Sequence, residues 1–209
     1  MKTENDPIIR EGETAIDFII AETDRLYIRE FNIDDVDAVL DYSADAENTH
    51  FMELGPENRD GVVNFIHSRL IHQVMEDRLA YDLAVCLKST GEMIGSVGLY
   101  LSKDRMQADL GYIFNKKCWG LGYCTEAAAK MLEFGFLQLD LHRITARCDS
   151  KNAASEAVMK RIGMRFEGEM KSSVYTRVGG RRQWRSEKHY ALLQREFLKR
   201  MADGSWDGE

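Results

Sequence analysis

Two glycines that stand two residues apart directly precede a segment with helical spacing. They are Gly120 and Gly122, in the stretch from Cys118 to Ala129. Glycine adopts positive φ readily and lets another group approach the main chain closely. A helix that begins after such a turn presents unpaired N–H groups and the positive end of its dipole, and together these bind phosphate. The stretch therefore predicts a site for a phosphate-bearing ligand.

Two better-known phosphate-binding patterns do not fit this spacing. The dinucleotide fingerprint needs a third glycine where Thr125 stands, and no Gly-Lys-Ser/Thr follows as in a P-loop. The alternative is a turn that only starts a helix. A glycine in the preceding predicted strand, Gly111, favours a binding role, as do Thr125 and Glu126, which suit a first helical turn.

The composition indicates one globular domain. The chain has 209 residues, 44% of them apolar, and a net charge of −7 that argues against nucleic-acid binding. No apolar run reaches the roughly 20 residues that span a bilayer. The polar N-terminus does not resemble a signal peptide. The four cysteines form no C-x-x-C pair and the histidines no metal-type spacing, so we expect reduced thiols, no metal, no membrane partner and a cytoplasmic location.

Hydrophobic spacing predicts an α+β fold with a mixed sheet. Three strands joined by short turns are followed by one strand–helix–strand unit and a final hairpin. We expect an N-terminal extension over residues 1–21, one domain over 22–201 and a disordered tail over 202–209. The predicted strands cover residues 25–31, 80–87, 93–101, 106–114, 143–148, 164–178 and 183–193, and the predicted helices cover 35–42, 58–78, 125–137, 152–161 and 196–201. Gly111 suggests a bulge or a close backbone approach in its strand.

Several segments, in order, resemble one known family. Gly111-Tyr112-Ile113, followed by Trp119 to Ala127, is similar to the acyl-CoA-binding motif of the GNAT N-acetyltransferases. The closest resemblance is to their ribosomal-protein N-terminal acetyltransferase (RimJ/RimL-type) subgroup. Further matches follow at Leu141 to Ala146, Asn152 to Ser155 and Ile162 to Gly168. The resemblance extends from about residue 22 to 198.

This resemblance implies a three-layer fold, with a largely antiparallel central sheet between helices, and acetyl-CoA as co-substrate. It assigns the pyrophosphate to main-chain N–H groups of the glycine turn, the thioester carbonyl to an N–H near Gly111, and the pantetheine arm to Asn152, which could otherwise serve only as a helix cap. The implied cofactor-binding residues are Gly111, Tyr112, Ile113, Trp119, Gly120, Leu121, Gly122, Tyr123, Cys124, Thr125, Asn152 and Ser155.

The candidate catalytic residues depend on one departure from the family. Many relatives place a tyrosine seven residues after the Asn, where this chain has Met159, so Ser155 becomes the candidate donor to the leaving thiolate. Asp109 and Glu187 are the candidate bases. The alternatives are a solvated serine and an exposed strand carboxylate. An amine that arrives already deprotonated would need no strong base.

The hypothesis is an acetyl-CoA-dependent N-acetyltransferase in which an amine attacks the thioester directly in a ternary complex. No cysteine is paired with a base in sequence, which disfavours an acyl-cysteine intermediate. The acceptor is left open between a protein N-terminus, an aminoglycoside, a polyamine and an amino-acid-like amine, and the protein between a monomer and a homodimer. A non-catalytic acyl-CoA sensor and a purely structural domain are the competing interpretations.

Overall fold

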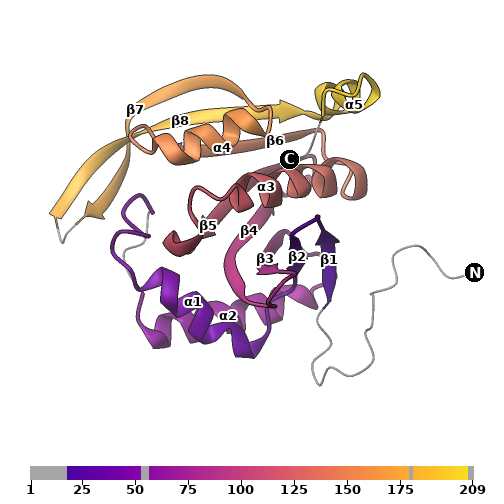
Figure 1. Cartoon of the computed structure of the whole chain (residues 1–209). Coiled ribbons are helices and arrows are strands. Elements are labelled where there is room, and N and C mark those ends of the chain that lie inside the picture. The colour runs from indigo at the N-terminus through magenta and orange to yellow at the C-terminus, as the bar shows by residue number, and fades with distance from the viewer. Residues whose placement is uncertain (1–17, 53–56, 179–180, 207–209) are drawn as a thin grey trace, which may run out of the picture.

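A single eight-stranded sheet forms the centre of the molecule in the computed structural model, which describes residues 18–52, 57–178 and 181–206 (Figure 1). The strand order is β1-β2-β3-β4-β5-β6-β8-β7, and only β5 and β6 run parallel. The strands are β1 (Ile19–Glu22), β2 (Leu26–Arg29), β3 (Ala80–Leu87), β4 (Met93–Leu101), β5 (Gln107–Phe114), β6 (Arg143–Asp149), β7 (Arg165–Val178) and β8 (Arg181–Leu193).

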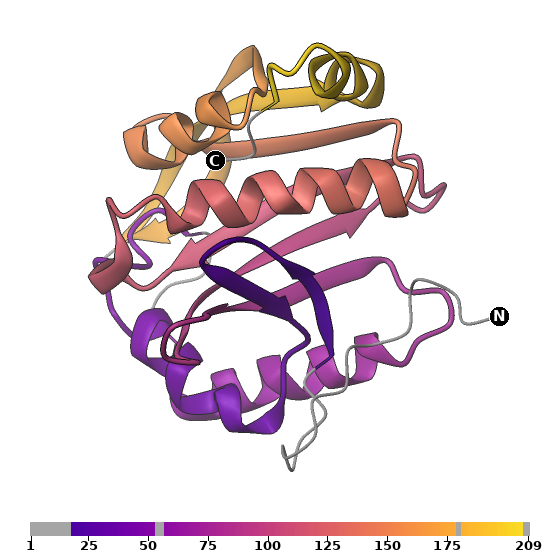
Figure 2. The same ribbon diagram turned by 45° about the vertical axis from the view of Figure 1, so that its right-hand side comes forward.

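Helices cover both faces of this sheet. The helices are α1 (Val36–Ser43), α2 (Arg59–Gln73), α3 (Tyr123–Glu133), α4 (Ala153–Arg161) and α5 (Gln194–Ala202), with short helical turns η1 (Ile33–Asp35), η2 (Lys116–Cys118) and η3 (Phe134–Gln138). Figures 1 and 2 show α1 and α2 on one side of the sheet and α3 and α4 on the other. This arrangement confirms the predicted mixed, largely antiparallel sheet between helical layers.

Each helical layer packs its own apolar core against the sheet. On the α3 side, Met131 and Leu132 are fully buried with sheet residues such as Leu99. The other core joins α1 and α2 to the opposite face, with Val62 and Ile66 fully buried. Three successive alanines, 127 to 129, are at most 2% exposed. Their small side chains let α3 lie close to the sheet, which fixes the position of its N-terminus.

The structure corrects several predicted boundaries. Helix α2 ends at Gln73 rather than at residue 78. The prediction extended too far because the apolar spacing continues at Val74. That side chain is 83% exposed and does not pack. Helix α3 begins at Tyr123, two residues before the predicted start. Strand β1 pairs with β2, so the last residues of the expected 1–21 extension belong to the sheet, whereas residues 1–17 lie outside the described part.

Two further expectations concern Gly111 and the C-terminal tail. The pairing of β4 with β5 runs without a register shift through Gly111, so there is no bulge; a Cβ there would lie 3.2 Å from the Tyr100 ring, which is the close approach. In the tail expected to be disordered, Trp206 packs against Phe197 and its Nε1 donates to Glu133 at 3.1 Å. Residues 207–209 lie outside the described part. Among the described helices, none has both the length and the apolar character to cross a bilayer.

The parallel strands β5 and β6 stay paired over only three residue pairs. The ladder joins Gln107–Asp109 to Arg143–Thr145, and from residue 110 onward β5 pairs with β4 alone. Figure 2 shows the two strands diverging from that point. Main-chain N–H and C=O groups that would otherwise complete the ladder therefore face the opening between the strands. This opening lies beside the glycine turn that follows β5.

Candidate active site

The glycine turn has the left-handed backbone that its residue types predict. Gly120 has φ 76° and Gly122 has φ 84°, values that residues with a Cβ rarely adopt. Gly122 is the N-cap of α3 and contributes no side-chain cap, so the first N–H groups of the helix lack that acceptor. Gly120, Leu121 and Gly122 are exposed to solvent. The turn thus presents main-chain donors and a helix N-terminus to a ligand.

A side-chain brace fixes this turn against the start of β2. The Arg25 guanidinium donates from Nε to Glu126 Oε2 at 2.7 Å and from Nη1 to the Leu121 carbonyl at 3.0 Å. It also lies over the Tyr123 ring, 4.5 Å from the ring centre. The Glu126 side chain is 10% exposed and additionally accepts a hydrogen bond from Thr23 Oγ1. The first turn of α3 is therefore held in place by a residue about 100 positions earlier.

On the far side of the opening, Ser155 contacts a tyrosine of β5. Asn152 caps α4, because its Oδ1 accepts the Ser155 N–H at 3.0 Å. The Tyr112 hydroxyl lies 3.0 Å from Ser155 Oγ and 3.1 Å from the Ser155 carbonyl oxygen. Three of the predicted site residues therefore meet where β5 and α4 approach each other. Trp119, also predicted, donates from Nε1 to the Phe114 carbonyl at 2.8 Å and closes the loop after β5.

The cysteines near this junction are poor nucleophiles. None of the four cysteines, all of which lie in the described part of the chain, forms a disulfide. Burial raises the pKa of the Cys124 thiol to about 12 and is the main cause that raises the pKa of Cys148 to about 11. Both thiols therefore stay protonated near neutral pH, and the thiolate is the nucleophilic form. The structure offers no activated cysteine among these two for an acyl-enzyme step.

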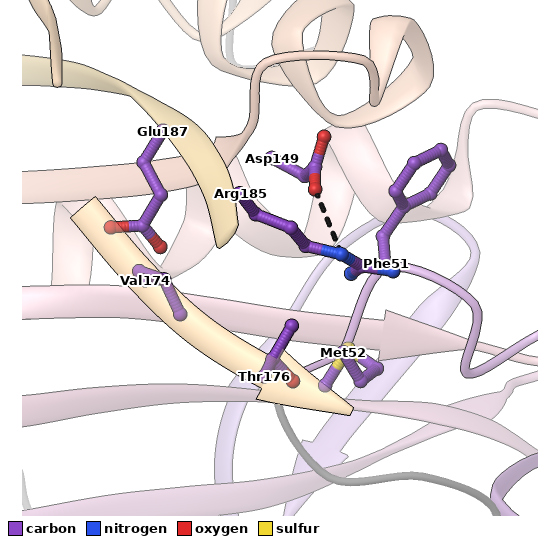
Figure 3. A pocket seen from close by; sticks show the side chains of 7 residues that line it. All are labelled: Phe51, Met52, Asp149, Val174, Thr176, Arg185 and Glu187. Carbon is purple, nitrogen blue, oxygen red and sulfur yellow. Dashed lines mark ion pairs between the residues drawn. The ribbon is translucent and has the colours of Figure 1, made fainter. Parts of the chain in front are cut away.

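A second feature is an open hollow at the carboxyl end of β6. Figure 3 shows side chains from the loop after α1, from β6 and from the β7–β8 hairpin around it. The lining residues are Phe51, Met52, Asp149, Val174, Thr176, Arg185 and Glu187. We call this hollow the hairpin pocket. Because Asp149 ends β6 just before the Asn152 cap, the pocket lies close in the chain to Ser155.

The hairpin pocket contains two carboxylates and one guanidinium. Asp149 and Arg185 form an ion pair with 3.4 Å between Oδ2 and Nε, and both side chains are at most 10% exposed. Glu187 is 9% exposed, and its nearest cations, His189 Nε2 and Arg147 Nη1, are 3.7 and 3.9 Å away. Those separations are beyond hydrogen-bonding distance. Asp149 thus has the shorter ion pair, with Arg185, and Glu187 has two longer ion pairs, with His189 and Arg147.

The two candidate bases occupy different environments. Glu187 lines the hairpin pocket and is the cross-strand partner of Asp149. Asp109 lies in the closed part of the β5–β6 ladder, opposite Thr145, whose hydroxyl donates to its carboxylate. Asp109 is not among the pocket residues. The structure therefore places Glu187, and not Asp109, beside the space that an acceptor could occupy.

The loop that carries Phe51 and Met52 is held from both sides. The Lys116 N–H of η2 donates to Asn48 Oδ1 at 2.8 Å, and Arg185 Nη2 donates to the His50 carbonyl at 2.7 Å. Lys116 also pairs with Asp45 at 2.7 Å, and Lys117 with Asp41 at 2.8 Å. Asp41 in α1 and Asp45 just after it are therefore neutralised by the two lysines that precede the glycine turn.

Sequence reasoning missed two parts of this site. The brace residue Arg25 lies in a segment that matched the family, but nothing in its neighbours indicated that it reaches Glu126. The Asp149–Arg185 pair was also missed, because the two residues are 36 positions apart and meet only through the pairing of β6 with β8.

Comparisons with known proteins agree with this geometry. The family model for the acetyltransferase (GNAT) domain matches residues 25–165. The uncharacterized N-acetyltransferase YnaD of Bacillus subtilis is 32% identical over 175 residues, which cover 84% of this chain and 97% of YnaD. The crystal structure of a GNAT-family acetyltransferase from Bacillus anthracis superposes with a TM-score of 0.73 at 31% identity, covering 85% of this chain and 99% of that one.

A more distant structure has the same fold. The ribosomal L7/L12 α-N-protein acetyltransferase RimL, in complex with coenzyme A, superposes with a TM-score of 0.73 at 20% identity. The match covers 84% of this chain and 97% of RimL. At that identity the likeness concerns the fold.

Proposed function

We propose an acceptor and a set of catalytic roles for this chain. The chain belongs to the GNAT acetyltransferase family and is an acetyl-CoA-dependent N-acetyltransferase. The proposed acceptor is a molecule with a single amino group, which reacts in its deprotonated form, most simply the free N-terminus of a protein. The observation that carries this choice is the charge content of the hairpin pocket, where Asp149 is paired with Arg185 and Glu187 has only longer ion pairs, with His189 and Arg147.

The donor is held on the α3 side of the opening. Its pyrophosphate accepts hydrogen bonds from the N–H groups of the glycine turn, from Gly120 to Thr125, where the helix dipole also favours negative charge. These donors are exposed and their backbone is fixed by the Arg25 brace. The pantetheine arm then runs past Asn152 into the space between β5 and β6.

The thioester carbonyl is polarised by the main chain of β5. Beyond Asp109 this strand has no ladder partner on its β6 side, so an N–H in the Gly111–Ile113 segment is available to the developing oxyanion. Gly111 keeps this stretch free of a side chain that would meet Tyr100. A main-chain donor is fixed before the reaction begins and needs no rearrangement.

The acceptor amine enters from the hairpin pocket. Glu187 takes the proton that the amine loses as it attacks the carbonyl carbon. Its burial and the absence of a close cation at hydrogen-bonding distance suit a carboxylate that receives an ammonium group. Ser155 donates a hydrogen bond to sulfur as the C–S bond breaks. Attack is direct, because the pKa values of Cys124 and Cys148 keep both thiols protonated.

The charges around the hairpin pocket disfavour a polycationic acceptor. A polyamine or an aminoglycoside carries several ammonium groups and needs several free carboxylates. Asp149 is already paired with Arg185, and the Arg185 charge repels a second cation. The nearby Asp41 and Asp45 are paired with Lys117 and Lys116.

The test is release of free coenzyme A thiol from acetyl-CoA with a panel of amines at equal concentration. We expect turnover with peptides that have a free N-terminus and none with the same peptides blocked by N-acetylation. Faster turnover with spermidine or an aminoglycoside than with every free-N-terminus peptide would overturn the acceptor proposal. Binding of acetyl-CoA without turnover of any amine would instead favour a non-catalytic sensor.

A further inference from the structure

Tyr112 is the one tyrosine of β5, and its hydroxyl reaches the residue proposed to donate to the leaving thiolate. The oxygen lies 3.0 Å from Ser155 Oγ and 3.1 Å from the Ser155 carbonyl. Tyr112 and Ser155 are 43 residues apart, and they meet across the opening between β5 and α4. The seventh residue after Asn152 is Met159, which is fully buried and has no proton to give to a thiolate.

The hydrogen bonds around Ser155 favour one direction of donation. The Ser155 carbonyl is inside α4, where the N–H of Met159, four residues on, is its helical donor. Tyr112 has one proton, and Ser155 Oγ is the acceptor that the helix leaves without a donor. If Tyr112 donates to Ser155 Oγ, the serine proton is left for another acceptor; in the free protein Cys148 is such a neighbour. The reverse arrangement would turn the serine proton toward the ring.

Tyr112 keeps its proton throughout the physiological range. Desolvation of the partly buried ring is the main cause that raises the pKa of Tyr112 above its ordinary value, and nearby Cys124 acts in the same direction. A phenol that stays protonated acts as a lasting hydrogen-bond donor. Donation to a hydroxyl also strengthens that hydroxyl as a donor, because hydrogen bonds in a chain polarise one another.

We propose that Tyr112 is a positioning residue that donates a hydrogen bond to Ser155 Oγ and thereby aims the serine proton at the sulfur of the departing coenzyme A. This inference rests on the proposed function and deepens the role given to Ser155. As the C–S bond breaks, its electron pair goes to sulfur, and the Ser155 hydroxyl stabilises the thiolate by a hydrogen bond. The proton that the amine loses to Glu187 re-forms the thiol through water. Tyr112 and Ser155 end the cycle with their own protons.

A double-mutant cycle tests this dependence. Ser155→Ala is expected to lower kcat about 10- to 100-fold, in the range of a lost proton-donating group. Tyr112→Phe is expected to lower kcat about fivefold, as for one hydrogen bond, with the KM for acetyl-CoA unchanged. The double variant should have the kcat of Ser155→Ala alone, because Tyr112 acts only through the serine.

Tyr190→Phe is the matched control. The Tyr190 hydroxyl also ties a strand to α4, where it donates to Glu156 at 2.8 Å, one residue from Ser155. If the effect of Tyr112→Phe came only from a displaced α4, Tyr190→Phe would lower kcat to a similar extent. We expect its kcat to stay within about twofold of the parent protein, since a neutral structural change there leaves the Ser155 hydroxyl in place.

The outcomes separate this inference from the proposed function. A full fivefold loss from Tyr112→Phe in the Ser155→Ala background would overturn the positioning role, as would an equal loss from Tyr190→Phe. Unchanged turnover in Ser155→Ala would remove the serine from the mechanism and this inference with it, while the acetyltransferase activity stands. Absence of turnover in the parent protein with every amine would overturn the proposed function itself.

If Tyr112→Phe fails to fold, 3-fluorotyrosine at position 112 is the second variant. A stronger phenol donor should raise kcat only when Ser155 is present, and an equal rise without Ser155 would overturn the role.

Discussion

The donor side and the acceptor side of the site are built in different ways. The proposed donor side consists of main-chain groups within one short stretch, Gly120 to Thr125, whose conformation depends on two glycines with positive φ. The acceptor side is the hairpin pocket, made of side chains from a loop, from β6 and from both strands of a hairpin. Main-chain binding is insensitive to most substitutions, whereas side-chain pockets change with each one. The donor should therefore be shared across a family and the acceptor should vary.

The two sides are nevertheless mechanically connected. The loop of the hairpin pocket is tied to η2 through Asn48 and Lys116, and to β8 through Arg185. The segment η2 leads directly into the glycine turn. The glycine turn and the loop that lines the pocket are therefore joined through η2. Variants on each side show how far the two functions can be separated.

The largest effect is expected from Gly122→Val, which should reduce acetyl-CoA affinity by more than about 100-fold. A valine at φ 84° is strained, and its Cβ would lie 3.3 Å from Arg25 Nη2, so the turn and its brace must both move. Calorimetric titration with acetyl-CoA measures the loss. Gly91→Val is the matched control, because Gly91 has φ 75° but no atom within 4 Å of its Cβ position. Retained affinity in Gly122→Val would contradict the assignment of the turn.

Glu187→Gln should separate the acceptor side from the donor side. We expect kcat to fall about 100-fold or more, because a general base is lost, with acetyl-CoA affinity unchanged. Initial rates at saturating acetyl-CoA, together with calorimetric titration, measure both quantities. Asp109→Asn is the comparison, and its loss of kcat should be smaller, since Asp109 is hydrogen-bonded to Thr145 in the closed part of the ladder. A larger loss from Asp109→Asn would reverse the choice of base.

A smaller effect is expected when the brace is removed. Arg25→Ala should raise the KM for acetyl-CoA about two- to fivefold, since the Arg25 side chain is 48% exposed and partly exposed ion pairs contribute little. Steady-state kinetics with acetyl-CoA as the varied substrate measure it. Arg59→Ala removes a more exposed pair with Asp37 and should leave the KM unchanged. An equal rise in both variants would mean that the brace has no specific role.

The last prediction is that neither Cys124 nor Cys148 becomes acetylated by acetyl-CoA. The pKa of Cys124 is about 12 and that of Cys148 about 11. Because a raised pKa favours the neutral thiol, both groups lack a reactive thiolate below about pH 9. Intact mass measured after incubation with acetyl-CoA and no amine, at pH 7 and pH 9, should show no added acetyl group. Acetylation of either cysteine that disappears when amine is added would contradict direct attack.

Much of the fold could be predicted because the patterns involved are local. Alternating and helical apolar spacing located the central strands and helices, and the ordered motifs indicated the family. The errors occurred where packing overrides periodicity. Val74 continues the apolar pattern of α2 but meets no partner, and Trp206 follows a polar tail but finds Phe197 and Glu133. Those contacts depend on segments that are distant in the sequence.

The candidate site divides in the same way. The sequence alone determined the glycine turn and the helix that follows it, because positive φ at Gly120 and Gly122 and a helix N-terminus are properties of neighbouring residues. Only the tertiary structure gives Asp109 and Glu187 different surroundings, since strand register places one against Thr145 and the other beside Asp149. It also decided which tyrosine meets Ser155, because only the divergence of β5 from β6 brings Tyr112 to α4.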